Sequence, residues 1–149
     1  MDVETAWGVT GAVICLALCA MGSATGSCVA ASATVGAWKK CYAQNKQAPF
    51  LLVTFVGFPL SQTLYGMILL FGMLPKAAVG FPMLVFGVVV GIAVGLPAYL
   101  EGLVGAAAAD SQAETGQGLT KYLTALGIIE TAAVFAMMFA LLALRSFPT

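Results

Sequence analysis

Apolar residues dominate the chain in four long stretches that are separated by short polar connectors. The stretches run over about 6–37, 48–74, 81–114 and 118–144. Because about 20 helical residues cross the hydrocarbon core of a bilayer, each stretch is long enough to span a membrane. The small residues within them recur every three or four positions, which is the spacing of one face of a helix. The pattern therefore predicts an all-α integral membrane protein with four transmembrane helices.

A stripe of small residues runs along the first stretch and recurs, 76 positions later, in the third. Its members in the first stretch are Gly11, Cys15, Cys19, Gly22, Gly26, Ala30, Ala33 and Ala37. Their counterparts in the third stretch are Gly87, Gly91, Gly95, Ala98, Gly102, Ala106, Ala109 and Ala113. Small residues let helix backbones approach closely in lipid. We expect the glycines of the stripe to pack the first and third helices side by side in a closed inner ring; a compact four-helix bundle is the alternative.

The second and fourth stretches also correspond, at a shift of 70 positions, as in the pairs Thr54 with Thr124 and Gly57 with Gly127. The chain is therefore predicted to be two tandem helical hairpins, residues 1–76 and 77–149. The second and fourth helices are expected outside the inner ring, with Leu69 facing lipid.

Composition and charge agree with a membrane protein. The chain is 61% hydrophobic and only 8% charged, whereas soluble domains are about 25% charged. The formal net charge is zero, so nothing suggests a nucleic-acid partner. The basic residues divide between two sides of the membrane, with Lys39, Lys40, Lys46 and Lys121 on one and Lys76 and Arg145 on the other. This bias predicts cytoplasmic connectors in a cell (inner) membrane, with both termini extracytoplasmic.

Two carboxylates interrupt the apolar stretches. Glu130 lies in the middle of the fourth stretch and Glu101 lies in the third. A charged group near the centre of a bilayer costs several kcal/mol, so such residues usually bind an ion, a proton or a ligand. Counted along the helices, both carboxylates and Gln62 reach a similar depth of about 20 Å.

Polar groups of the second stretch share one helical face. Phe58, Ser61, Gln62 and Tyr65 follow the i, i+3, i+4, i+7 spacing. Pro59 is expected to distort the helix and leave the Phe55 carbonyl without its partner. Carboxylate, amide, hydroxyl and carbonyl oxygens at one depth suit a hard cation such as Na⁺, or a proton on a carboxyl group. Hydrogen bonds that merely join helices are the alternative.

At these positions the chain resembles a known family. The runs Gly22–Gly26 and Pro59–Gly66 and the pair Glu130-Thr131 are similar to the duplicated proteolipid, the rotor-ring c (or K) subunit of bacterial V-type ATPases, and especially to its sodium-translocating members. The resemblance implies that Na⁺ is held by the Phe58 carbonyl, Ser61, Gln62, Glu101 and Glu130, with Tyr65 locking Glu130. Thr131 is a further expected residue of the ion-binding site. Sodium-type members carry Gln where this chain has Glu101. We expect Glu101 to hold a proton while Glu130 binds Na⁺, with H⁺ as the alternative cargo.

The resemblance also implies the setting in which the chain works. It implies a homo-oligomeric ring in membrane lipid, a stator a/I-type membrane subunit and a central-stalk d/C-type subunit on the cytoplasmic side. The chain itself is then not an enzyme. The rival interpretations are a small cation-coupled multidrug exporter that uses a membrane glutamate, and a structural four-span protein.

Overall fold

The computed structural model describes residues 1–148, which form helices and connectors without a strand in that range. The helices are α1 (Val3–Ala43), η1 (Phe50–Leu52), α2 (Val53–Gly57), η2 (Phe58–Leu60), α3 (Ser61–Met73), η3 (Leu74–Val79), α4 (Phe81–Thr115) and α5 (Leu119–Leu144). They make four spans that are long and apolar enough to cross a membrane, with the segments from η1 to η3 forming the second. The predicted all-α architecture with four such helices is confirmed.

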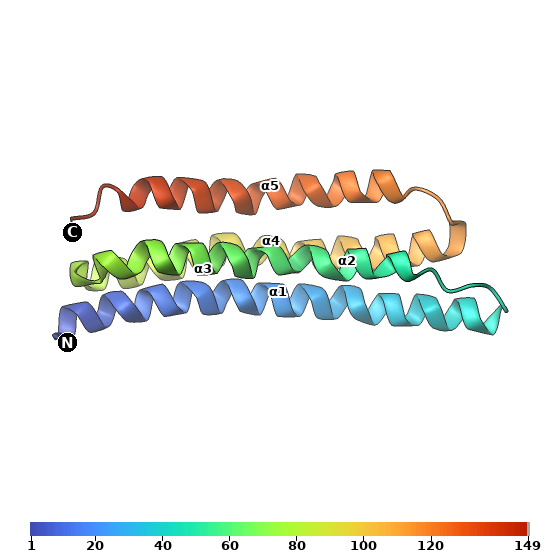
Figure 1. Cartoon of the computed structure of the whole chain (residues 1–149), viewed down its shortest axis with the longest axis horizontal. Helices are drawn as coiled ribbons and strands as arrows, with labels where there is room; N and C mark the ends of the chain where they lie inside the picture. The colour runs from blue at the N-terminus through green and yellow to red at the C-terminus, as the bar shows by residue number, and fades with distance from the viewer. Residues whose placement is uncertain (149) are drawn as a thin grey trace.

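The four spans run up and down beside one another, and both termini lie at the same end of the molecule (Figure 1). The turns between spans use residues that suit a chain reversal. Gly80, before α4, and Gly116, after it, have φ angles of 77° and 67°, a region that glycine adopts without a steric penalty. At the start of α1, Asp2 accepts a hydrogen bond from the Thr5 amide, which lowers the pKa of the Asp2 carboxyl.

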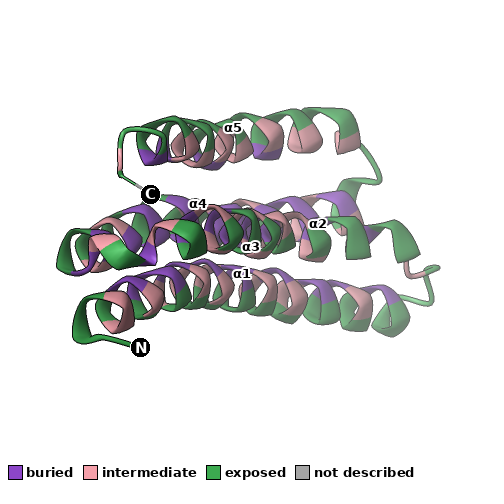
Figure 2. Ribbon diagram, turned by 60° about the vertical axis from the view of Figure 1, so that its left-hand side comes forward, coloured by how far each residue is buried: buried purple, intermediate pink, exposed green. Residues whose placement is uncertain are grey.

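The most extensive helix contact is between α1 and α4, which run parallel. The two stripes of small residues face each other along this contact. A Cβ atom added to Gly102 would overlap the Gly26 carbonyl, and one added to Gly87 would overlap the Gly11 carbonyl. Glycine is thus required here because the two backbones touch. Figure 2 shows buried residues concentrated where α1, α3 and α4 meet, whereas the α5 span is the least buried of the four.

The stripes therefore already have a partner inside one chain. The packing of α1 on α4 uses Gly11, Gly22, Gly26, Gly87, Gly91, Gly95 and Gly102, each of which would bring an added Cβ against the opposite helix. Their role between neighbouring copies in a ring remains a prediction, as does the division into hairpins at residue 76.

The expectation that Leu69 faces lipid is wrong. Leu69 is fully buried, in a core that also contains Cys15 and Cys19 of α1. The physical reason is its helical register, because Gln62, Gly66 and Leu69 lie on one face of α3, and that face packs inward. The exposed positions of α3 include Leu64 and Phe71.

The ends of α1 and α4 project together beyond the apolar region. At 1.5 Å per residue, the 41 residues of α1 extend about 60 Å, roughly twice the hydrocarbon thickness of a bilayer. Near the C-terminal ends of both helices, Lys40 of α1 pairs with Asp110 of α4 at 2.7 Å and with Glu114 at 3.4 Å. These ion pairs are exposed and so contribute little to stability, but they show that the two helices remain side by side at this end.

Candidate ion-binding site

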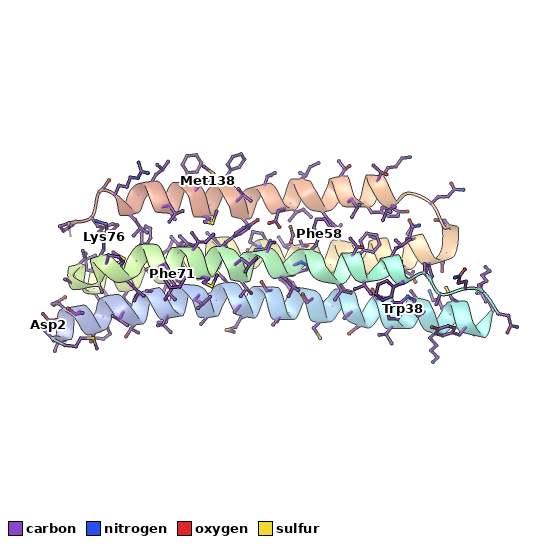
Figure 3. All side chains as sticks on the ribbon, in the orientation of Figure 1. Asp2, Trp38, Phe58, Phe71, Lys76 and Met138 are labelled. Atoms are coloured by element: carbon purple, nitrogen blue, oxygen red, sulfur yellow. The ribbon has the colours of Figure 1, made fainter. Side chains whose placement is uncertain are left out.

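The predicted distortion at Pro59 is present in the second span. A 3₁₀ turn, η2, separates α2 from α3, and Pro59 lies at its beginning. Proline has no backbone N–H and cannot continue a regular α-helix. The Ser61 hydroxyl donates to the Phe58 carbonyl at 3.1 Å, so this backbone oxygen lies next to the polar side chains. Phe58 itself lies on the side of the second span that faces α5 (Figure 3).

Three helices bring their polar side chains together beside this turn. The Gln62 amide nitrogen donates to Glu130 Oε2 of α5 at 2.8 Å and to Glu101 Oε2 of α4 at 3.0 Å. Ser61 Oγ lies 3.0 Å from the same Glu130 oxygen. The other oxygen of Glu130 accepts a hydrogen bond from the Tyr65 hydroxyl. Gln62 therefore joins two carboxylates that lie 29 positions apart in the sequence.

The two carboxylates differ in their exposure. Glu101 and Gln62 are fully buried, whereas Glu130 is partly exposed. Glu130 lines an open groove of about 530 Å³ together with Thr54, Gly57, Phe58 and Ser61. Glu130 is thus accessible from the outer surface of the helices, and Glu101 is enclosed behind it.

Oxygen acceptors outnumber the protons available to them in this cluster. Ser61, Gln62 and Tyr65 supply four polar hydrogens in all, while the two carboxylates, the Gln62 amide and the Phe58 carbonyl present six oxygens. Within residues 1–148, no cationic side chain pairs with either glutamate. Two ionised carboxylates this close in a low-dielectric interior repel strongly. The chemistry of the cluster is therefore that of a site for a cation, a proton, or both.

The buried Glu101 supplies a second sign of this imbalance. Its Oε1 atom has no hydrogen-bond partner among the described residues, although its Oε2 accepts from Gln62. A buried, unpaired oxygen costs more when it is ionised than when the carboxyl is neutral. A proton on Glu101 would reduce this cost.

The structure does not bring Thr131, which was expected in the ion-binding site, into the cluster. Thr131, which follows Glu130, is exposed and its hydroxyl donates to the Ile128 carbonyl of its own helix at 2.6 Å. Successive helical residues point about 100° apart, so the neighbour of an inward-facing glutamate turns outward. Leu60, which corresponds to Glu130 in the first half of the chain, is also exposed.

One polar contact beside the cluster was not predicted from the sequence. Ser23 of α1 is buried, and its hydroxyl accepts a hydrogen bond from the Thr63 amide at 3.1 Å. The sequence indicates a buried position for Ser23 only through its place between Gly22 and Gly26, where the backbones of α1 and α4 approach closely.

The comparison with known protein families bears on the helices that carry both glutamates. Residues 84–143 match the family model of the ATP synthase C subunit. The matched range covers most of α4 and α5 and includes Glu101 and Glu130. Together with the four long apolar helices, the match fits a duplicated proteolipid of the ion-translocating rotor ring. A search of curated proteins found no match.

This similarity distinguishes between the rival interpretations. The matching model describes a subunit of ATP synthase, so the match favours a rotor-ring proteolipid over a multidrug exporter. The four long apolar helices agree with a multi-pass membrane location.

Proposed function

We propose that this chain is one subunit of the rotor ring of a V-type ATPase and that Glu130 carries Na⁺ across the membrane. The observation that carries the proposal is the cluster in which Ser61 and Gln62 share one oxygen of Glu130 and Tyr65 holds the other. A carboxylate placed among a hydroxyl, an amide and a backbone carbonyl offers the oxygen ligands that a hard cation prefers.

Charge balance gives Glu101 its proposed role. One Na⁺ compensates one carboxylate, so a second ionised carboxylate would leave a net negative charge in a low-dielectric interior. Glu101 is fully buried with one unpaired oxygen, which favours its neutral form. In the proposed loaded state, Glu130 is ionised and binds Na⁺ while Glu101 keeps a proton. If H⁺ is the cargo instead, both carboxyls are protonated in the loaded state.

The difference in exposure between Glu130 and Glu101 supports a route by which the ion exchanges. Glu130 borders the open groove, so an ion enters and leaves there while Glu101 and Gln62 stay in place behind it. Each copy would load at a stator a/I-type subunit and rotate past lipid with Glu130 neutralised, because an unpaired carboxylate in lipid is costly. Release would follow at a second opening, with a d/C-type subunit transmitting rotation from the cytoplasmic side. The termini would be extracytoplasmic.

A carbodiimide labelling experiment tests this function and its ion. Carbodiimide modifies protonated carboxyls, so Na⁺ should protect Glu130 of the purified protein, and protection should strengthen as pH rises because fewer protons compete. Glu101→Gln should keep the protection and make it depend less on pH, since Gln has no proton to lose. The modified residue is identified by mass spectrometry of peptides.

The outcomes separate the two cargoes. If Na⁺ gives no protection at any pH between about 6 and 9, the cargo is H⁺ and the sodium proposal is wrong. If Glu130 is not labelled in the absence of Na⁺ at any pH, its role as carrier is wrong.

A further inference from the structure

The second span meets α1 at three successive positions around the Pro59 turn. These contacts run in antiparallel register: Cys19 lies against Gly66, Ser23 against Thr63, and Gly26 against Pro59. The outer two contacts are apolar and tight, since a Cβ on Gly66 would come within 2.7 Å of Cys19 Cβ, and one on Gly26 within 3.0 Å of Pro59 Cβ. The hydrogen bond of Ser23 is the polar contact between them.

Ser23 provides a partner for a backbone N–H beside the Pro59 turn. Thr63 is the third residue of α3, directly after η2, where the change from 3₁₀ to α geometry interrupts the regular ladder of helical hydrogen bonds. In the membrane interior there is no water to replace that partner. Ser23 Oγ accepts from this N–H at 3.1 Å, and the Ser23 side chain is only 1% exposed.

The group that Ser23 holds is next to the ion ligands. Ser61 and Gln62 precede Thr63 in the same first turn of α3, and the Gln62 amide nitrogen donates to both carboxylates. Displacements of about 0.5 Å are enough to degrade a binding constellation. A contact that fixes this turn therefore fixes two of the proposed ligands.

We infer that Ser23 is a positioning residue of the ion site, which holds the first turn of α3 in place without touching the ion. This inference rests on the proposed function of Glu130. Ser27 provides the matched control, because it lies four residues later on α1 and its hydroxyl has no partner among the described residues.

The experiment compares three variants with the wild type in carbodiimide labelling of Glu130. Ser23→Ala removes the acceptor, Ser23→Cys keeps the size with a weaker acceptor, and Ser27→Ala removes a hydroxyl that holds nothing. The Na⁺ concentration for half-protection should rise about tenfold in Ser23→Ala, as the loss of a partner for a buried amide predicts, and by less in Ser23→Cys. Ser27→Ala should stay within about twofold, with the melting temperature measured in each case.

Each result decides the inference. Equal half-protection in both serine-to-alanine variants overturns it. If Ser23→Ala does not assemble, Ser23→Cys takes its place, and a shift no larger than that of Ser27→Ala overturns the inference. If Na⁺ protects none of the proteins, the sodium proposal fails separately, and the pH of half-labelling is compared among the same variants. A wild type in which Glu130 is never labelled overturns the carrier role and this inference with it.

Discussion

At the scale of single residues, the two glutamates have different environments, which agree with the different tasks proposed for them. Glu130 is partly exposed, borders the groove and has hydrogen-bond partners on both oxygens. Glu101 is enclosed and has a partner on only one oxygen. An ion that must be exchanged needs the accessible carboxylate, while the enclosed one sets the local charge.

We predict that Glu130→Gln abolishes ion transport by the complete complex while the protein still assembles. Glutamine keeps the size and polarity of the side chain and can accept a hydrogen bond on its one amide oxygen, but it has no charge to bind or release an ion. Transport into vesicles and assembly in detergent are measured side by side. Glu114→Gln is the control, since Glu114 is an exposed carboxylate at the far end of α4. Coupled transport by Glu130→Gln would contradict the assignment.

At the scale of helices, close backbone contact gives the site its geometry. The paired stripes bring α1 and α4 together along their length, and α3 and α5 pack against them. The short turn at Pro59 interrupts the second span at the level of the carboxylates. Because α4 carries Glu101 and α5 carries Glu130, the site depends on packing among helices that contribute no ligand as well as those that do.

We predict that Gly102→Leu prevents folding of the chain itself, rather than only its assembly into a ring. The added side chain would start inside the Gly26 backbone, and overpacking of this kind costs about 3 kcal/mol or more. The yield of monodisperse protein and its melting temperature are the measurements. Leu103→Phe enlarges the next, exposed residue and should have little effect. Normal yield and melting temperature for Gly102→Leu would show that the contact between α1 and α4 tolerates the larger side chain.

At the scale of the whole molecule, the outer surface is apolar. Exposed large side chains occur on every span, among them Met21, Leu64, Leu96 and Phe139. Figure 3 shows Met138 on the side of α5 that points away from the other helices. An apolar exterior of this extent needs lipid or a further copy of the chain to cover it.

We predict that the purified protein forms one large oligomer with a fixed number of copies in mild detergent. Rotation requires identical sites arranged in a closed ring, and cyclic symmetry gives a single defined copy number. Native mass spectrometry measures that number directly. A monomer or dimer across several detergents would contradict the ring and would favour an exporter.

Several features follow from the sequence because they depend on local patterns. The length and polarity of the apolar stretches predict four spans, and the structure places helices there within a few residues. Helical spacing groups Ser61, Gln62 and Tyr65 on one face, and Pro59 marks the turn, since both effects act within a few residues of the chain. Counting residues from the span ends also predicts that Glu101 and Glu130 reach the same depth.

Other features are decided only by tertiary packing. The sequence identifies the stripes of small residues, but the fold shows that they pair within one chain and that Leu69 is buried. The partner of Ser23 is 40 positions away, and the rotation of each helix decides that Thr131 points outward while Glu130 points to Gln62. The orientation of each helix about its axis, and its contacts with other helices, result from the packing of whole helix faces. That packing depends on many residues that are distant in the sequence. A periodic pattern gives the face of a helix, but only the assembled bundle fixes which face meets which.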